Sequence, residues 1–375
     1  MNTWIELNAQ HLMNNLELLG KRAGKATLMP VLKANAYGHG ISQVFEIFAN
    51  KGMPEWLGVN DLGEAEVLRK LGFGGRILVM GPLRETDIKI AKALTCDFFM
   101  STPEIFSSWK AEGFFSGAHL KIDTGMGRQG FAPKDFEKFY ERELRPGPGA
   151  ERLAGVCTHF ANVEDVLEQD FADQQLKVFE AALLKLRSSG FSGMVHAASS
   201  ASGLILPSSR LDLVRAGIST YGFWPSARTR LSYTRDPDKK DDLLPVLSWK
   251  TRVMQLKTME PGSFIGYGCS YRTEREEIIA VLPVGYFEGY PRLASKAQSY
   301  VLVDGHRCPV RGRVCMNMMM IEVTHVPSVR VGSEAVLIGA SDKETLPAEQ
   351  LAEWAETIHY EIVTRIHDKI PRFIV

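Results

Sequence analysis

The sequence has few cysteines, and their arrangement argues against a disulfide framework or a zinc site. Five cysteines are scattered along the chain without any CxxC spacing. Zinc sites and disulfide-rich folds show regular cysteine spacings instead. We therefore predict no metal site, and we expect the cysteines to be reduced, buried small residues. They are Cys96, Cys157, Cys269, Cys308 and Cys315.

Charge of one sign is not in excess, and a long apolar run is missing. Lys plus Arg equals Asp plus Glu at 44 each, with no basic block, so we expect a small-molecule partner rather than nucleic acid or a membrane. No apolar run approaches the roughly 20 residues that span a bilayer. The opening segment MNTWIELNAQHL lacks the pattern of a secretory signal, which predicts a cytoplasmic protein.

The first 220 residues instead show a regular alternation of short apolar runs and helical patterns. Stretches such as 62–72 and 163–190 repeat apolar residues every three to four positions and end in glycine, as amphipathic helices do. Eight such alternations predict an α/β fold, a (β/α)8 TIM-type barrel, which typically needs about 250 residues. An open doubly wound sheet is the alternative, but no GxGxxG follows the first run. The runs lie near 29–32, 56–59, 77–80, 98–100, 120–122, 153–158, 194–196 and 213–215.

A change of composition after Trp224 predicts a second domain. The chain has 375 residues, of which 45% are hydrophobic, so it can fill two cores. We divide it into a barrel (1–226), a charged, solvated connector (227–245) and a mostly β domain (246–375) with closely spaced apolar runs. The first few residues could pair with the second domain.

A lysine at the end of an apolar run is the clearest sign of chemistry. In VLKANAYGHG (31–40), Lys33 follows Val31 and Leu32 and precedes Tyr37 and two glycines. A buried strand would deliver this amine to its C-terminal end, where desolvation lowers the pKa and allows a Schiff base. A solvated lysine at a strand end is the alternative, and it is the commoner case for a lysine taken alone.

Other reactive side chains follow later predicted strands, at the end of a barrel where active sites lie. They comprise a second amine, two arginines, an imidazole, a carboxylate and two hydroxyls before a glycine turn. Hydroxyls and backbone amides after the late strands commonly hold a phosphate. A phosphate beside a Schiff-base lysine indicates pyridoxal 5'-phosphate. The residues are Lys121, Asp123, Arg128, His159, Ser199, Ser200, Arg215, Gly217 and Ile218.

Seven motifs, in order, resemble those of alanine racemases, which are pyridoxal-phosphate enzymes with a barrel and a β domain. The motifs are VLKANAYGHG, HLKIDTGMGRQGF, THFA, VRAGISTYG, GYGCSY, LPVGYFEGYPR and GRVCMNM. The match extends from TWIELN to YEIVTRIHDKIPR, and seven ordered motifs are much more specific than any one of them. The chain is thereby identified as a member of this family. The resemblance implies an isomerase that interconverts L-alanine and D-alanine and supplies D-alanine for peptidoglycan.

The resemblance also implies two catalytic bases. Lys33 would hold the cofactor and serve as one base, and Tyr267 from the other protomer would be the second, on the opposite face of the substrate's Cα. Because a tyrosine has an ordinary pKa near 10, it needs help from its neighbours, and the resemblance gives that part to His159 and Arg215. Arg215 would also face the pyridine nitrogen and leave it unprotonated. Taken alone, Tyr267 could be a turn residue and Arg215 could satisfy strand-end carbonyls.

Further binding roles follow from the same resemblance. Arg128 would bind the substrate carboxylate and the cofactor hydroxyl, and Lys121 beside it would carry a carbamate. Tyr286 and Met316, like Tyr267, would reach the barrel mouth of the other protomer, so a complete site needs a head-to-tail homodimer. The implied phosphate contacts are Tyr37, Ser200, Gly217 and Ile218.

Three positions depart from the family pattern and leave the substrate range open. Asn317 replaces a common aspartate, Ser199 replaces an asparagine, and Asp368 stands near a tyrosine of some members. Together with Asn162 they leave a broader racemase acting on serine or larger side chains as an alternative. A basic-amino-acid decarboxylase would need an acidic pocket and a cysteine proton donor, and no motif around Cys315 fits it. A non-enzymatic pyridoxal-phosphate carrier would lack the second domain.

Overall fold

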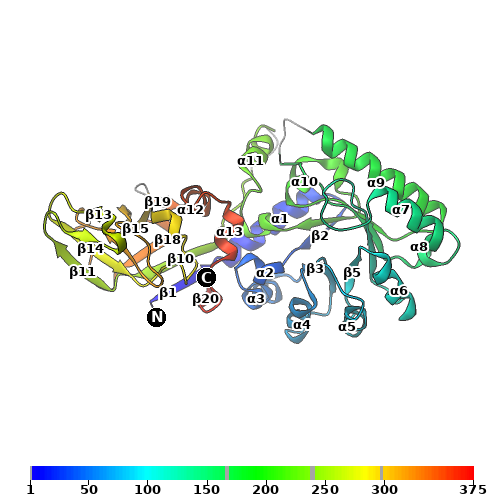
Figure 1. Ribbon diagram of the computed structural model, residues 1–375, viewed down its shortest axis with the longest axis horizontal. Coiled ribbons are helices and arrows are strands. Elements are labelled where there is room, and N and C mark those ends of the chain that lie inside the picture. Colours follow the sequence, from blue (N-terminus) through cyan, green and yellow to red (C-terminus); the bar gives the residue numbers. More distant parts are fainter. Residues whose placement is uncertain (1, 165–168, 237–240, 296–298) are drawn as a thin grey trace. The chain divides into compact units, whose positions relative to one another are not determined.

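The chain forms two compact units, which we call the barrel unit and the strand-rich unit (Figure 1). The computed structural model describes residues 2–164, 169–236, 241–295 and 299–375. The barrel unit comprises Gln10–Ala34 and Phe45–Leu244, and the strand-rich unit comprises Met1–Ala9, Asn35–Val44 and Pro245–Val375. The segment directly after Lys33 therefore belongs to the strand-rich unit, although the chain on both sides of it belongs to the barrel.

Parallel strands at the eight predicted positions form the wall of the barrel unit. β3 to β8 pair in chain order, and β2 pairs with β9. Leu32 N–H donates to the Gly58 carbonyl (2.6 Å) and Asp212 N–H donates to the Val195 carbonyl (3.0 Å), so β2 is joined to β3 and β8 to β9. The predicted (β/α)8 barrel is confirmed. The strands are β2 (Thr27–Pro30), β3 (Trp56–Val59), β4 (Arg76–Val79), β5 (Asp97–Met100), β6 (Ala118–Lys121), β7 (Gly155–Cys157), β8 (Met194–His196) and β9 (Leu213–Ala216).

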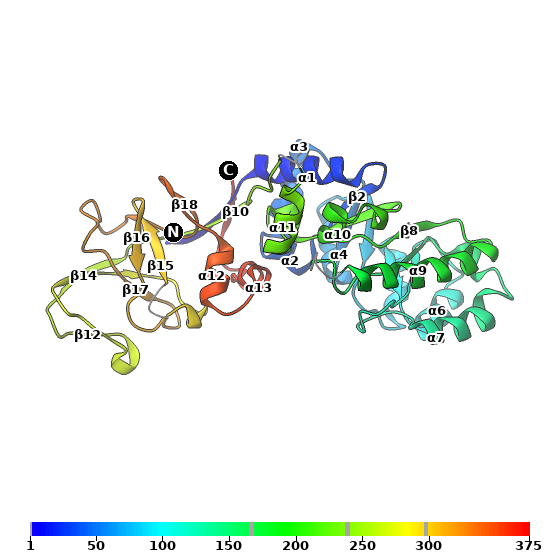
Figure 2. The ribbon, with the colours of Figure 1, turned by 90° about the horizontal axis from the view of Figure 1, so that it is seen from above.

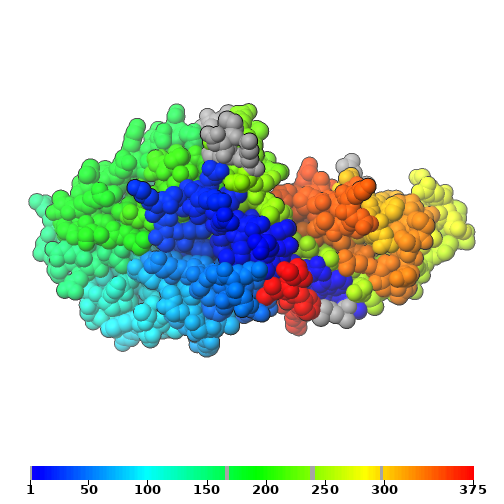
Figure 3. Space-filling view, turned by 180° about the vertical axis from the view of Figure 1, so that it is seen from behind, coloured from blue at the N-terminus to red at the C-terminus, as the bar shows by residue number. Residues whose placement is uncertain are grey.

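Helices follow these strands and lie outside them (Figure 1, Figure 2). Their starts are encoded locally: Asp61 accepts a hydrogen bond from Glu64 N–H (3.1 Å) at α4, and Thr102 caps α6. In Figure 3 α1, in dark blue, lies on the surface of the barrel unit. The helices are α1 (Ala9–Ala23), α3 (Ile41–Lys51), α4 (Leu62–Lys70), α5 (Asp87–Ala93), α6 (Pro103–Ala111), α7 (Pro133–Phe139), α8 (Gly149–Arg152), α9 (Asp170–Ser188), α10 (Ser200–Ile205) and α11 (Ala227–Thr234), with short turns at Tyr140–Leu144, Pro207–Ser209 and Ile218–Tyr221.

The helices predicted at 62–72 and 163–190 correspond to α4 and α9, although 165–168 lie outside the described residues. Across the described ranges of the chain, no helix is both long enough and apolar enough to cross a membrane.

The segment 227–245, predicted to be a solvated connector, instead contains the packed helix α11. Tyr233 in this helix is fully buried, receives a hydrogen bond from Arg22 Nε (2.6 Å) and packs against Trp224. Thr229 in the same helix is also fully buried, and the charged residues around these two side chains conceal them in the sequence. Residues 237–240 of the segment lie outside the described part of the chain.

The strand-rich unit is built on a sheet with the order β16-β15-β18-β10-β1-β20, and β19 pairs with β18. A second sheet has the order β11-β14-β17, and β12 pairs with β13. β1 is antiparallel to β10 and parallel to β20, so the first and last strands of the chain share one sheet. The strands are β1 (Thr3–Leu7), β10 (Leu247–Arg252), β11 (Gln255–Met259), β12 (Phe264–Ile265), β13 (Tyr271–Arg272), β14 (Glu277–Leu282), β15 (Tyr300–Val303), β16 (His306–Pro309), β17 (Met319–Glu322), β18 (Glu334–Ser341), β19 (Glu344–Leu346) and β20 (Arg372–Ile374). The helical segments are α12 (Ala348–Trp354), α13 (His359–Thr364) and the turns Tyr267–Cys269 and Arg292–Ser295.

The cysteines are free thiols, as predicted, but not all of them are buried. Cys96, Cys157 and Cys308 are buried, whereas Cys269 is exposed and Cys315 is half-buried. The expectation of burial was wrong for the last two because both lie in surface turns of the strand-rich unit rather than in strands.

Candidate functional site

Lys33 stands just after the first barrel strand, where α2 (Lys33–Tyr37) makes a left-handed turn. Ala34, Asn35, Ala36 and Tyr37 have φ angles of 55°, 54°, 55° and 52°. A left-handed conformation costs roughly 1–2 kcal/mol for each residue that carries a Cβ. Of these four only Asn35 tolerates it readily, so the turn is strained and needs support from other parts of the chain.

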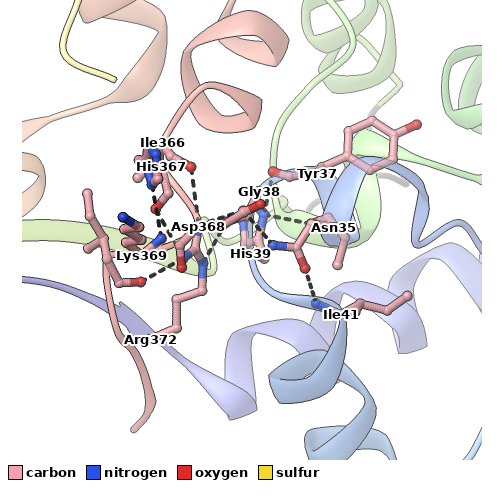
Figure 4. A network of polar contacts seen from close by, with 12 residues as sticks. Asn35, Tyr37, Gly38, His39, Ile41, Ile366, His367, Asp368, Lys369 and Arg372 are labelled. Atoms are coloured by element: carbon pink, nitrogen blue, oxygen red, sulfur yellow. Dashed lines mark hydrogen bonds and ion pairs between the residues drawn. The ribbon is translucent and has the colours of Figure 1, made fainter. Parts of the chain in front are cut away.

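Hydrogen bonds within the strand-rich unit supply that support (Figure 4). Asn35 Oδ1 accepts from Ile41 N–H, and Asn35 Nδ2 donates to Asp368 Oδ1, both at 2.8 Å. Arg372 Nε donates to the Gly38 carbonyl (3.0 Å). A side chain at Gly38 would collide with the α13 backbone, since a Cβ there would lie 1.9 Å from the Val363 carbonyl oxygen. The C-terminal segment therefore fixes the turn that contains Tyr37.

The surroundings of Lys33 favour the neutral amine. Burial lowers the pKa of this amine below its ordinary value, the charge of Arg128 lowers the pKa further, and Glu64 opposes the shift. The neutral amine is the form that attacks a carbonyl carbon. This supports the prediction that Lys33 is a reactive lysine.

Arg215 is a buried cation on β9. Its Nη2 donates to the carbonyls of Thr158 (2.7 Å) and Ala197 (2.9 Å) and to His159 Nδ1 (3.2 Å), and its Nη1 donates to His196 Nδ1 (2.7 Å). None of the carboxylates within the described ranges pairs with it. An acceptor or anion brought by a bound molecule would therefore be favourable here.

The two histidines that receive these bonds are held neutral. Burial lowers the pKa of His159 and of His196 well below the ordinary value, and the charge of Arg215 adds to the effect. Because Arg215 donates to Nδ1 of each ring, each neutral ring carries its proton on Nε2. His159 is thus prepared as an Nε2–H donor.

The predicted phosphate residues after β8 and β9 lie together. Ser199 caps α10, and its N–H donates to Ser202 Oγ (2.8 Å). Ser200 Oγ accepts from the Gly217 N–H (2.9 Å), and Ile218 directly after it is buried. The structure therefore brings Ser200 and the Gly217 turn into one polar cluster, in which the Gly217 amide bonds to Ser200.

Asp123 shapes the loop that carries Arg128. Its Oδ1 accepts from the N–H groups of Gly125 (3.0 Å), Met126 (2.8 Å) and Gly127 (3.1 Å), and its Oδ2 accepts from Arg128 N–H (3.0 Å). Burial raises the pKa of Asp123, but these four bonds outweigh burial and leave the pKa below its ordinary value. Asp123 is therefore a structural anion of the loop.

Lys121 is buried at the end of β6, close to the predicted substrate arginine. Burial lowers its pKa to about 8, and its Nζ lies 5.5 Å from the ring centre of Phe99. A small pocket is lined by Lys121, Asp123, Arg128 and His159, among others. The structure thus brings four of the predicted site residues of the barrel unit to one place.

The remaining predicted residues belong to the strand-rich unit and lie on its surface. Tyr267, Tyr286 and Met316 are 71%, 44% and 55% exposed. Hydrogen bonds from Tyr286 N–H to the Cys315 carbonyl (3.1 Å) and from Phe287 N–H to the Met316 carbonyl (2.9 Å) join two of their loops. Exposed aromatic and thioether groups on firmly held loops are suited to contact another molecule.

Sequence reasoning missed three residues that support the site. His119 and His196 are fully buried in barrel strands, and Arg372 supports the strained turn. A histidine inside an apolar strand is the only available signal for the first two, since their partners are distant in sequence. No group of three or more His, Cys, Asp or Glu side chains suited to a metal occurs within the described ranges.

Comparison with known proteins accounts for both units. Residues 7–225 match the model of the alanine racemase N-terminal domain, and residues 246–374 match that of the alanine racemase C-terminal domain. An alanine racemase of Leptospira interrogans is 38% identical over 100% of this chain and 96% of its own length. An alanine racemase of Symbiobacterium thermophilum is 40% identical over 99% of this chain and 96% of its own length.

Solved structures agree with these matches. The alanine racemase from D-cycloserine-producing Streptomyces lavendulae has a TM-score of 0.89 and 30% identity, covering 100% of this chain and 97% of that one. The Bacillus anthracis alanine racemase with bound L-Ala-P has a TM-score of 0.87 and 32% identity, covering 100% and 95%. The chain belongs to the alanine racemase family.

Proposed function

We propose that this protein interconverts L-alanine and D-alanine and so supplies D-alanine for peptidoglycan. The observation that carries the proposal is a single barrel that combines the reactive Lys33 with the buried Arg215–His159 pair, in a chain that matches alanine racemases over its full length. The charge of Lys33 contributes to the lowered pKa of His159, so these groups belong to one electrostatic environment.

The donor set of the barrel fits pyridoxal 5'-phosphate. Lys33 offers an amine whose pKa is lowered, the buried Arg215 has hydrogen-bonding capacity for a ring nitrogen, and Ser200 offers a hydroxyl at the start of a helix. Tyr37, Gly217 and Ile218 would complete the phosphate contacts. When bound, this cofactor withdraws electrons from the Cα of the amino acid and makes its hydrogen acidic.

Two side chains of this protein would move the Cα proton. The amine of Lys33 accepts it on one face, and the hydroxyl of Tyr267 from the other protomer gives a proton on the opposite face, or the reverse. His159 is suited to assist the tyrosine through its Nε2–H, since its Nδ1 accepts from Arg215. Arg215 keeps its own proton, so it can donate a hydrogen bond to the ring nitrogen without protonating it.

Arg128 is placed to bind the substrate carboxylate, because a guanidinium matches a carboxylate in shape and charge. Its loop is held in position by the Asp123 bonds. Lys121 nearby has a pKa of about 8, so a large fraction of it is the neutral amine that reacts with carbon dioxide. A carbamate there would give Arg128 an anionic neighbour.

A homodimer would complete the site. Tyr267, Tyr286 and Met316 are exposed on the strand-rich unit, and exposed apolar groups of this size are typical of interfaces. In a head-to-tail pair each barrel would receive these three side chains from its partner.

The direct test follows L-alanine in deuterium oxide with the protein loaded with pyridoxal 5'-phosphate. We expect D-alanine that carries deuterium at Cα, because protons exchange with solvent at both bases. Loss of alanine without the D-isomer, or unchanged L-alanine, would contradict the proposal. L-serine tested in parallel addresses the alternative of a broader racemase. That alternative stays open because Asn317 stands where a carboxylate is common, and its Nδ2 donates a hydrogen bond to Glu288 Oε1 (2.8 Å).

A further inference from the structure

Five side chains, which we call the axial chain, run inside the barrel unit from Arg76 to Arg215. Arg76 binds the Asp97 carboxylate with two hydrogen bonds (2.6 and 3.1 Å), and an oxygen of Asp97 lies 3.4 Å from His119 Nε2. His119 Nδ1 lies 2.9 Å from His196 Nε2, and His196 Nδ1 lies 2.7 Å from Arg215 Nη1. The chain is therefore continuous through both imidazole rings.

The axial chain connects the two ends of the barrel. Arg76 and Asp97 are the first residues of β4 and β5, His119 is the second residue of β6, and His196 is the last of β8. Asp97 and Arg215 are each 5% exposed, and both histidines are fully buried. Polar groups at this depth are costly unless they are hydrogen-bonded, so this arrangement needs a reason beyond packing.

A glycine makes room for the two histidines to meet. β7 runs between β6 and β8, and Gly155 pairs with His119 in the register of β6 and β7. A Cβ at Gly155 would lie 2.2 Å from His119 Nδ1. Any side chain there would displace the imidazole from its contact with His196. Gly155, which has no side chain, therefore occupies the β7 position that the axial chain crosses.

The hydrogen-bond donors fix one arrangement of protons. A guanidinium can only donate, so Arg215 makes His196 Nδ1 an acceptor and leaves the proton of that ring on Nε2. His196 then donates to His119 Nδ1, which leaves the proton of His119 on Nε2, facing the Asp97 carboxylate. The two hydrogen bonds from Arg76, together with the His119 ring 3.4 Å away, outweigh burial and keep the pKa of Asp97 below its ordinary value, so Asp97 is the acceptor that faces this ring. The tautomers fixed from the Arg215 end are therefore those that point an N–H toward the Asp97 carboxylate.

We propose that Asp97, acting through His119 and His196, is a positioning residue that fixes the orientation and hydrogen-bond donors of Arg215. A residue at the N-terminal end of the barrel thereby fixes the orientation of Arg215, which would face the cofactor ring at the other end. This last statement rests on the proposed function. The order of donors does not, because it is a property of the protein alone.

The test begins with ¹⁵N spectra of the histidine rings in cofactor-free protein at about pH 8. We expect both His119 and His196 as Nε2–H tautomers. In Asp97→Ala the ring nitrogen signals of His196 should shift, although His196 does not touch Asp97. The matched control is Asp87→Ala, since Asp87 is also a shielded carboxylate paired with an arginine, Arg84. It should leave the signals of His196 unchanged.

Two outcomes of this measurement overturn the proposal: an Nδ1–H tautomer of either ring in the wild-type protein, or His196 signals that Asp97→Ala does not move. If Asp97→Ala fails to fold, Asp97→Asn gives the same decision, because it keeps the size of the side chain and removes the negative charge that faces His119. The tautomers of the wild-type protein can be measured without any variant.

In the loaded enzyme, Asp97→Ala should lower kcat about tenfold with little change in KM, as loss of an outer partner of a functional histidine commonly does. The visible absorption band of the bound cofactor should shift in the same variant. Unchanged kcat and an unchanged band would contradict the link to the cofactor. A wild-type enzyme without racemase activity would refute the proposed function alone and leave the tautomer result standing.

Discussion

The predicted site residues of the two units differ in how far the chain itself prepares them. In the barrel unit, Arg215 is 5% exposed and makes four hydrogen bonds. In the strand-rich unit, Tyr267 is 71% exposed. The site residues of the barrel unit are thus held in place within one chain, whereas those of the strand-rich unit lie on its surface. The difference indicates that barrel substitutions will affect stability and chemistry together, and that surface substitutions will separate the two.

Lys33→Ala should have the largest effect. Removing the amine removes both the anchor for the cofactor and one base, so racemisation should fall by about 10⁴-fold or more. Lys25→Ala, which removes an exposed lysine just before the same strand, is the matched control and should keep full activity. A Lys33→Ala enzyme that retains a tenth of the wild-type rate would contradict the assignment.

Tyr267→Phe should separate chemistry from stability. We expect kcat to fall by roughly 10²–10³-fold. The melting temperature should stay within about 1 °C of the wild-type value, because the exposed hydroxyl contributes little to folding. Steady-state kinetics in both directions and calorimetry measure the two effects. A large loss of stability, or activity close to wild type, would contradict the claim that Tyr267 is an exposed catalytic residue with little part in folding.

Arg372→Met tests the support of the left-handed turn. The Arg372 side chain is 4% exposed, and it bonds to the Gly38 and Ile370 carbonyls at 3.0 and 2.6 Å. We expect the free energy of unfolding in urea to fall by about 2 kcal/mol, because buried carbonyls lose a charged donor. Arg365→Met, at a 71% exposed side chain on the same segment, should cost less than about 0.5 kcal/mol. Equal losses in the two variants would contradict the role of Arg372.

Carbamylation of Lys121 should produce the smallest effect. The pKa of about 8 means that the neutral, reactive fraction of the amine falls as the pH drops below that value. With ¹³C-labelled bicarbonate we expect a carbamate signal that weakens from pH 8 to pH 6, about tenfold per unit once the amine is mostly charged. It should be missing in Lys121→Met. A bare amine in the intact mass and no ¹³C signal would refute the carbamate.

The barrel could be predicted from sequence because its signals are local. Each wall strand is a short apolar run, and Lys33 follows the first of them. The resemblance named Arg215 and His159, and the structure joins them by a hydrogen bond. The prediction of the fold therefore succeeded where burial and periodicity agreed, and the roles of the site residues stay predictions.

The parts that escaped prediction depend on distant residues. The left-handed turn after Lys33 is stabilised by Asp368 and Arg372, more than 300 positions away in sequence. His119 meets His196 only because the barrel places β6 and β8 on either side of Gly155. The helix α11 is anchored by two isolated buried side chains, Thr229 and Tyr233. None of these contacts leaves a periodic pattern in the sequence.

The central claim is that a complete site joins Lys33 of one chain to Tyr267 of another. Lys33→Ala and Tyr267→Phe, each nearly inactive alone, should regain activity when they are unfolded, mixed and refolded together. In a hybrid dimer one of the two sites would carry both wild-type residues, so an equal mixture should reach about one quarter of wild-type activity. If both residues acted within the same chain, the mixture would stay as inactive as its components, and that result would contradict the account.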